Sequence, residues 1–570
     1  MDRPNSCGSH SVINAEADYH EAHMCERDSA AKPATVAAGN PTFPGTQARG
    51  LPGRWNACCS CPFSALPDDL VTHMLEFLDR RSLLTASGVC SRFNFLVEQP
   101  FVWRRLALTN GGAVDDAAGA PCSGIGLARL LERQSRSASV EVLDVPRLTL
   151  GADAAATAKA LAALRLPRLQ EVDVSGALAS LVDAASGIGA AALRSFLVAH
   201  APQLTRLVLD GAVSLNDGDV AAVLAAAPRL KHLSLVGCAQ LTDAALAPLL
   251  LQQQQQQQAG AGVPPTPNPN IVYPPPRLSV LRVNGCIRLT GATLAGVART
   301  CAGRLRVLEA RGVPGIGDAV LTAIASTSPS LSQLDIGRSD PFGASRAPPG
   351  CVGGSLSCAG LRALASRCRG LTVLRMQGLA AIGDDDIAAA VGCLDQLAVL
   401  DARGCRGLGA KTVRALATGA AAARLVELRL FNCDLVGDEE LKMIGKAMRR
   451  LETLDIYGCR RASADVVISV IQALSAPPCV CTAASDLNRP STAATKTRVA
   501  SECNCPMTST SGRRLRRAWV GGIPSVRAAL PRATGPTSGL AAVVNTHRGD
   551  TERYVQMSAL FPASVDVRIF

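Results

Sequence analysis

LKHLSLVGCAQLTD at residues 230–243 and LVELRLFNCDLVGD at residues 425–438 are two copies of one pattern. The pattern reads Leu-x-x-Leu-x-Leu-x-Gly-Cys. A weaker copy begins at Val140, and clear copies begin at Leu169, Leu204, Leu230, Leu278, Leu305, Leu331, Leu371, Leu397, Leu425 and Leu451. Six of the nine steps between clear copies are 26 to 28 residues long, a period that indicates stacked structural repeats.

Each copy has a physical reading. The apolar residues at the first, fourth and sixth positions, such as Leu451, Leu454 and Ile456, point inward from a short strand. A glycine at the eighth position lets the backbone turn, and a capping or acidic group such as Thr242-Asp243 then begins a helix. One repeat cannot bury both of its faces. The pattern therefore predicts an α/β solenoid over residues 140–475, a horseshoe with parallel strands inside and helices outside.

Two of the longer steps contain low-complexity sequence. The step of 48 residues includes a polyglutamine and proline-rich stretch at 251–276, and the step of 40 residues includes a Gly/Pro/Ser stretch at 339–357. Added length in a surface loop costs little entropy. We expect both insertions to lie in surface loops.

The ninth position holds cysteine at Cys238, Cys286, Cys405, Cys433 and Cys459. In this the repeats resemble the cysteine-containing class of leucine-rich repeats, with about ten to eleven repeats. By that resemblance the array should follow an F-box.

Residues 66–106 read LPDDLVTHMLEFLDRRSLLTASGVCSRFNFLVEQPFVWRRL. The segment predicts three short amphipathic helices, the first opened by Pro67 and two acidic residues. Some 40 residues bury too little apolar surface to be stable alone. We therefore expect the segment to complete its core against a partner or against the repeats.

The segment, with boundaries at 63–108, resembles an F-box, with Phe93 where Trp is commoner. This resemblance implies binding to the Skp adaptor, which connects to the cullin of a ubiquitin ligase. The positions carried over as adaptor-binding are Leu66, Pro67, Leu70, Leu78, Leu83, Val89, Phe93 and Trp103.

The fifth and seventh positions of each copy should point outward onto the concave face of the horseshoe. Arginine with aromatic residues is typical of protein-recognition surfaces, and such residues gather toward the C-terminal copies. The predicted target contacts are Arg375, Arg403, Arg429, Phe431 and Tyr457. The alternative is that these residues form only a solvated face.

Outside the repeats the sequence is weakly patterned. We expect disorder at 1–62 and 476–570 and a linker at 109–139. Residues 475–570 hold twelve Lys/Arg and five Asp/Glu, so +7 of the net +12 lies there and the rest is nearly balanced. This distribution argues against a nucleic-acid partner. A polar start and the lack of a long apolar stretch predict no signal peptide and no membrane span, hence a cytoplasmic or nuclear protein with reduced thiols.

Smaller motifs point to no chemistry of their own. The pairs Cys479/Cys481 and Cys503/Cys505, with a cluster at 58–61, could hold zinc, but structural zinc sites usually use C-x-x-C spacing. The cluster at 58–61 could be acylated. Arg513–Arg517 is a basic cluster that suits nuclear import or simple solvation. No histidine sits with a nucleophile at a catalytic spacing, so we predict no catalytic residue, no metal and no cofactor.

The sequence therefore predicts a non-catalytic adaptor that brings an unknown protein substrate to a Skp–cullin–F-box ubiquitin ligase for proteasomal degradation. Two alternatives stay open. The repeats could be a protein-interaction scaffold outside any ligase, or the concave face could hold a small molecule beneath the target, as in plant hormone-receptor F-box proteins.

Overall fold

The computed structural model describes residues 63, 66–78, 80–107, 127–128, 130–131, 134–145, 154–176, 188–250, 277–301, 303–338, 356–379, 382–475 and 515–520, and short strand segments at 543–544, 553–554 and 566–568. The segment predicted to be disordered at 1–62 lies outside these residues. So does the insertion predicted at 251–276, and all of the insertion predicted at 339–357 except its last two residues.

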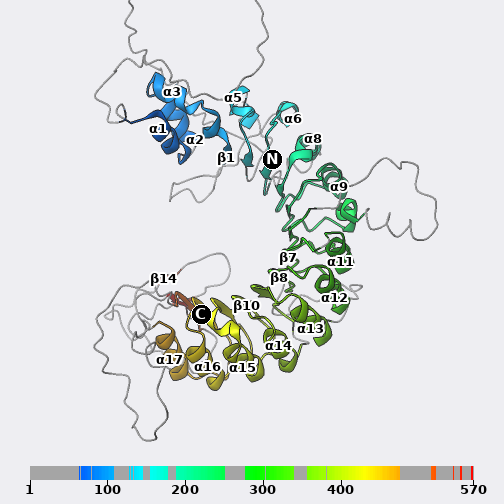
Figure 1. Ribbon diagram of the computed structural model, residues 1–570, viewed down its shortest axis with the longest axis vertical. Helices are drawn as coiled ribbons and strands as arrows, with labels where there is room; N and C mark the ends of the chain where they lie inside the picture. The colour runs from blue at the N-terminus through cyan, green and yellow to red at the C-terminus, as the bar shows by residue number, and fades with distance from the viewer. Residues whose placement is uncertain are drawn as a thin grey trace, which may run out of the picture. The chain divides into compact units, whose positions relative to one another are not determined.

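A helical segment, residues 66–103, opens the described chain (Figure 1). It contains α1 (Asp68–Glu76), α2 (Arg80–Ser87), α3 (Ser91–Val97) and the 3-10 turn η2 (Pro100–Trp103). Pro67 lies in the extended region just before α1, and acidic residues occupy the first turn, where they favour the helix dipole. The three helices predicted from the sequence are therefore confirmed.

A long parallel sheet begins directly after this segment (Figure 1). Strand β1 (Arg105–Ala107) pairs with β2 (Val142–Asp144), and each later strand pairs with its predecessor in chain order. These strands are β3 (Glu171–Asp173), β4 (Arg206–Val208), β5 (His232–Ser234), β6 (Val280–Arg282), β7 (Val307–Glu309), β8 (Gln333–Asp335), β9 (Val373–Arg375), β10 (Val399–Asp401), β11 (Glu427–Arg429) and β12 (Thr453–Asp455). Strands β3 to β12 begin at the third position of the ten clear sequence copies, so the predicted register is confirmed.

Helices form a second layer along one side of this sheet (Figure 1). They are α6 (Ala154–Ala163), α8 (Ile188–His200), α9 (Asp217–Ala226), α11 (Gly291–Thr300), α12 (Asp318–Thr327), α13 (Cys358–Arg367), α14 (Asp384–Val391), α15 (Ala410–Thr418), α16 (Asp438–Ala447) and α17 (Ala464–Ser475). Short turns complete the layer: α5 (Gln134–Ser137), η3 (Ala201–Gln203), η4 (Asp243–Leu246) and η5 (Ala420–Ala423). The α/β leucine-rich-repeat solenoid expected from the sequence is the observed fold. No described helix is long and apolar enough to span a bilayer.

The core lies between the two layers. In one repeat Leu425, Leu428 and Leu430 are all buried, and Leu428 pairs in register with Leu400 and Leu454 on the neighbouring strands. Each such leucine removes enough apolar surface from water to contribute about 1.5–3 kcal/mol. The repeats therefore stabilise one another along the whole array.

The glycine and cysteine of the pattern act at the turn that follows each strand. Gly404 and Gly458 have positive φ angles, and Asn432 takes the same left-handed conformation with φ 54° in the repeat between them. The cysteine thiols donate hydrogen bonds to carbonyl groups of the preceding repeat, such as Cys405 Sγ to Met376 O at 3.1 Å and Cys459 Sγ to Leu430 O at 3.2 Å. The cysteines thus link repeats as well as fill space.

Acidic residues at the helix starts make a second link between repeats. Asp384 accepts hydrogen bonds from the backbone N–H of Gly409, Lys411 and Thr412 and from the Thr412 hydroxyl, at 2.6–2.9 Å. Burial alone would raise the pKa of Asp384, but these bonds hold it below its usual value. Asp217, Asp243, Asp318 and Asp438 make the corresponding contacts in other repeats.

Within residues 476–570, which the sequence predicts to be disordered, the structure describes short strands. Strand β13 (Arg517–Trp519) pairs with β12 as a further parallel strand, and β16 (Asp566–Arg568) pairs with β13. Leu515, Ala518 and Val520 are buried, at the first, fourth and sixth positions of the repeat register. Apolar burial at these positions overrides the low apolar content of the surrounding sequence. A separate pair, β14 (Val543–Val544) and β15 (Arg553–Tyr554), is antiparallel.

Candidate protein-interaction surfaces

The inward side of the helical segment is conventionally packed. Val71 and Leu75 of α1, Leu83 of α2 and Leu96 and Val97 of α3 are buried. One charged side chain organises the entry to this core. The Arg92 guanidinium donates to Asp68 Oδ1 at 2.8 Å, to Phe63 O at 2.8 Å and to Leu66 O at 2.5 Å. It thereby fixes the Leu66-Pro67 loop against α1 and α3, a role that the sequence reading missed.

The outward side of the same segment is strongly apolar. Phe77 is 78% exposed, Val89 68% and Leu70 53%. The other exposed large apolar residues between residues 63 and 101 are Phe63, Met74, Leu78, Leu84, Phe95 and Phe101. Over all the other described residues only Ile188, Val213, Ile287 and Leu435 are comparable. Concentrated apolar exposure of this kind marks a surface that another molecule covers.

The structure divides the eight predicted adaptor-binding residues into three groups. Pro67, Leu70, Leu78 and Val89 are exposed, and Leu66 and Phe93 are half-buried. Leu83 and Trp103 are completely buried, so they support the segment from within and offer no surface to a partner. Phe93 packs edge-on against Phe63, with ring centroids 5.9 Å apart.

Trp103 lies where the helical segment meets the sheet. Its indole N–H donates to Val97 O at 2.6 Å, and Arg136 lies over its ring at 4.2 Å from the centroid. Arg136 also forms an ion pair with Glu98 at 2.5 Å. Trp103 and Leu106, the latter within strand β1, stand at the first and fourth positions of the repeat pattern. The helical segment is therefore continuous with the first strand of the solenoid.

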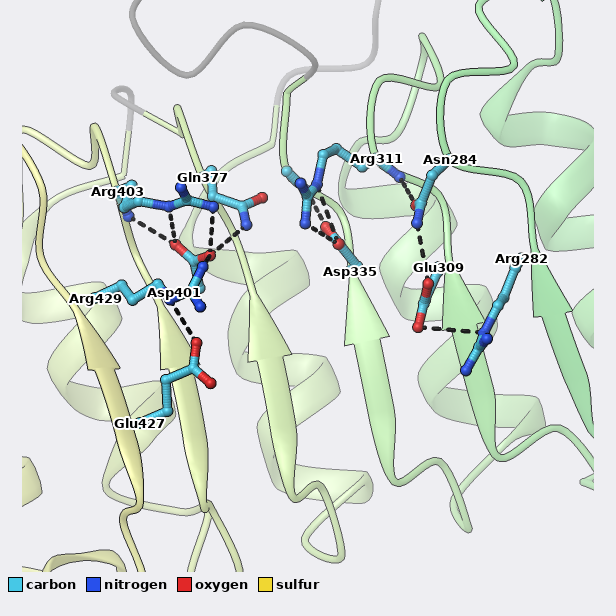
Figure 2. A network of polar contacts seen from close by, with 11 residues as sticks. Arg282, Asn284, Glu309, Arg311, Asp335, Gln377, Asp401, Arg403, Glu427 and Arg429 are labelled. Carbon is cyan, nitrogen blue, oxygen red and sulfur yellow. Dashed lines mark hydrogen bonds and ion pairs between the residues drawn. The ribbon is translucent and has the colours of Figure 1, made fainter. Parts of the chain in front are cut away.

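The second candidate surface is the sheet face that the helices leave uncovered, here called the strand face, which corresponds to the predicted concave face. Figure 2 shows a polar network across it. Asp335 binds Arg311 with an ion pair of 2.7 Å, and Asp401 binds Arg403 at 2.9 Å and Gln377 at 2.6 Å. Both carboxylates are about 1% exposed, whereas the Arg311 side chain is 36% exposed. The acids are thus buried beneath partly exposed guanidinium groups.

The structure places the three predicted arginine contacts on this face in different settings. Arg403 is held by Asp401, and Arg429 forms an ion pair with Glu427 at 2.5 Å (Figure 2). Arg375 is half-buried on β9, and its guanidinium group makes no ion pair or hydrogen bond with any residue that the structure describes. Its strand neighbours Asp335 and Asp401 are already engaged by Arg311, Arg403 and Gln377.

The two predicted aromatic contacts are brought together. Phe431 and Tyr457 stack with ring centroids 4.5 Å apart and an interplanar angle of 9°. Trp519 of β13 is half-buried and lies in register with Asp455 of β12. It was missed because its segment was predicted to be disordered. Burial raises the pKa of Asp455 to about 6, although the Tyr457 N–H, Arg403 and Arg429 favour its charged form.

The described residues contain no group of three or more His, Cys, Asp or Glu side chains placed to hold a metal ion. The cysteine pairs considered for zinc, at 479/481 and 503/505, lie outside the part of the chain that the structure describes, as does the cluster at 58–61. Burial raises the pKa of Cys286, Cys405 and Cys459 to about 12. These repeat thiols are therefore protonated and poorly suited to nucleophilic chemistry.

Comparison with known proteins gives one family match. Residues 63–109 match the F-box-like family. No curated protein sequence matches the chain.

Two solved structures share a likeness to the fold. The yeast Rad7–Elc1 complex is 15% identical, with 60% of this chain and 86% of that chain covered, at a TM-score of 0.38. An internalin, inlF of Listeria monocytogenes strain 4b F2365, is 17% identical, with 58% of this chain and 87% of that chain covered, at a TM-score of 0.32. These likenesses are too distant to carry an argument about partners.

Proposed function

We infer that this F-box/leucine-rich-repeat protein is a substrate-recognition subunit of a Skp–cullin–F-box ubiquitin ligase. In this proposal α1 to α3 bind the Skp adaptor, which connects to the cullin. The strand face holds a target protein, and the recruited conjugating enzyme transfers ubiquitin to a lysine of that target for proteasomal degradation. Such a protein would act in the cytoplasm or the nucleus.

The observation that carries the proposal is the exposed apolar set of the F-box-like domain. Leu70, Phe77 and Val89 face solvent in a chain whose repeats bury nearly all their leucines. Leaving such side chains in water forgoes about 25 cal/mol for each Å² of apolar surface. A partner that covers them recovers this free energy, and the match of residues 63–109 to the F-box-like family supports an adaptor as that partner.

The mechanism that follows is proximity. The chain continues from Trp103 into strand β1 without an intervening linker, and β1 forms main-chain hydrogen bonds with β2. An adaptor bound to the helices and a target bound to the sheet are then held in one complex, so the target lysine meets the conjugating enzyme at high effective concentration. The buried, protonated repeat thiols support a role without chemistry of its own.

For the target, we propose Arg375, Arg403, Arg429, Phe431 and Tyr457 as contact residues. The stacked aromatic pair supports this choice, because large rigid side chains give contact area at low entropic cost. Arg375 supports it as well, since its guanidinium group is not engaged by the described part of the chain. Trp519 of β13 adds a third aromatic residue near this end of the sheet.

The test is co-purification of the full chain with the Skp adaptor and cullin. The triple substitution Leu66→Ala, Pro67→Ala, Leu70→Ala should abolish it. A matched control, Val213→Ala, Ile287→Ala, Leu435→Ala, removes exposed apolar groups from the repeats instead and should leave co-purification unchanged. Circular dichroism of both variants checks that the repeats remain folded.

Two results would count against the proposal. Adaptor binding that survives the F-box substitution would show that this surface is not the interface. A wild-type chain that captures other proteins but never a cullin would favour the scaffold alternative.

A further inference from the structure

Five arginines form the layer nearest solvent on the strand face between β6 and β11. They are Arg282, Arg311, Arg375, Arg403 and Arg429, and all are half-exposed or partly exposed. The acids that pair with them lie deeper. Glu309 is 14% exposed against 39% for Arg282 in the same ion pair. The layer that meets solvent is therefore rich in N–H donors, and its acceptors are largely covered.

The acids also fix the direction of the arginines. Asp401 accepts from both Nε and Nη2 of Arg403, and Asp335 accepts from both Nε and Nη2 of Arg311 (Figure 2). A guanidinium group carries five N–H donors, so each of these side chains keeps donors that Asp335 and Asp401 do not use. Anchoring of this kind lowers the entropy that each arginine loses when a ligand binds.

Arg375 differs from the neighbouring arginines because no described side chain forms an ion pair or hydrogen bond with its guanidinium group. It lies on β9, in register with Asp335 on one side and Asp401 on the other. A cation in this central position attracts an anion supplied from outside. Farther along the sheet, Arg206 of β4 and Arg282 of β6 lie near His232, whose pKa is lowered to about 4, chiefly by burial and then by these two arginines.

We propose that the strand face recognises an extended acidic protein segment, whose carboxylates bind the arginine layer and whose apolar end packs on the Phe431–Tyr457 stack. This inference rests on the proposed function, because it names the class of target that the adaptor would carry. Guanidinium groups bind carboxylates through paired, charge-assisted hydrogen bonds. The arginines of the strand face suit this role because the acids beneath them hold their guanidinium groups in place.

The balance of charge favours a protein segment over a nucleic acid. The five arginines are matched by Glu309, Asp335, Asp401, Glu427 and Asp455 in the same region. The face therefore lacks the net positive field that binding to a phosphate backbone requires. Discrete carboxylates need only short-range contacts with individual arginines.

The dimensions set the length of the segment. From β6 to β12 there are six steps between neighbouring strands, which at about 4.8 Å each span roughly 29 Å. An extended chain advances about 3.3 Å per residue, so the segment needs about nine residues.

The experiment is selection of random dodecamer peptides displayed on phage against the full-length chain. The selected peptides should contain at least three Asp or Glu residues and an apolar or aromatic residue near one end. Arg375→Gln should raise the dissociation constant of the best synthetic peptide at least tenfold. Arg414→Gln, an equal charge change at an exposed position of α15 in the helix layer, should leave the constant unchanged.

Further arms separate the sources of negative charge and test folding. A version of the best peptide with phosphoserine in place of Glu shows whether the segment is acidic by composition or by phosphorylation, and tight binding of either version supports the proposal. Melting temperatures of Arg375→Gln and wild type should agree. A Phe431→Ala variant tests the aromatic end independently and should also weaken binding.

Selection of neutral or basic peptides, failure to select any, or full affinity in Arg375→Gln would overturn the inference. So would displacement of the peptide by a single-stranded RNA dodecamer at lower concentration than the unlabelled peptide. The F-box triple variant should bind the peptide as wild type does. If the wild-type chain bound the Skp adaptor but no acidic peptide, only this inference would be contradicted, and the proposed function would stand.

Discussion

In the F-box-like domain Leu70, Phe77 and Val89 face solvent, whereas in the repeats Leu400, Leu428 and their counterparts are fully buried. The two regions share one chain and similar apolar residue types. They differ because each repeat is covered by its neighbours, while three short helices have too few residues to cover one another. The difference teaches that the solenoid is stabilised from within, and that the domain keeps apolar surface for another molecule.

If this contrast is right, removing a repeat leucine should have the largest effect on folding. Leu428→Ala deletes side-chain atoms between Leu400 and Leu454, which lie in register on the neighbouring strands. Because the sheet holds these strands in place, the neighbouring residues cannot close around the cavity. The free energy of unfolding should fall by about 3–5 kcal/mol, measured by urea titration followed by circular dichroism. A loss below 1 kcal/mol would mean that the repeats do not share a close-packed core.

A smaller effect, an increase in the free energy of unfolding, is expected when the buried acid Asp455 on the strand face is replaced by a neutral residue. Burial raises the pKa of Asp455 to about 6 from 3.8. An acid with a raised pKa in the folded state costs stability, and this cost grows as the pH rises from about 4 through 6. Asp455→Asn keeps an oxygen that can accept from the Tyr457 N–H and should therefore stabilise the protein, by about 1–3 kcal/mol at pH 8.

The pH dependence is the control for this prediction. The gain from Asp455→Asn should be about 1 kcal/mol smaller at pH 5 than at pH 8 and nearly absent at pH 4, because wild-type Asp455 is then protonated in the folded state. Urea titrations at the three pH values provide the measurement. A gain that does not change with pH would mean that Asp455 is not the titrating group.

The smallest effect on folding should come from the exposed apolar set. Phe77 is 78% exposed, so Phe77→Ser should change the free energy of unfolding by less than about 0.5 kcal/mol. Its affinity for the adaptor should nevertheless fall about tenfold or more, since exposed aromatic residues often dominate binding. Urea titration measures the first effect, and calorimetric titration of the variant with purified adaptor measures the second. Equal affinity would place Phe77 outside the interface.

Much of the solenoid could be predicted from its sequence, because strand register and turn chemistry repeat. The spacing of Leu425, Leu428 and Leu430 located β11 to the residue. The same rule could have found β13, since Leu515, Ala518 and Val520 keep that spacing. It was missed because an alanine occupies the central position and a low-complexity sequence precedes it. The first repeat was missed for a similar reason, because Trp103 stands at the first position, where the clear copies have leucine.

The interaction surfaces were less predictable, because burial depends on contacts between distant parts of the chain. Apolar spacing placed Leu83 and Leu70 in one helical pattern, but only the fold shows that Leu83 faces inward. The three-way hydrogen bonding of Arg92 joins residues 24 to 29 positions apart and has no local signature. On the strand face only the alternation of charged residues along the strands could be predicted. Only the folded structure shows that Asp401 is buried beneath Arg403.

Hydrogen exchange of the full chain, alone and with a purified Skp adaptor, tests the central claim most directly. The account predicts that backbone amide exchange slows in α1 to α3 (residues 68–97) and stays unchanged in β6 to β12. Unchanged exchange in the helices, or slowing confined to the repeats, would contradict the claim that the exposed apolar side chains of the F-box-like domain are the adaptor's docking surface.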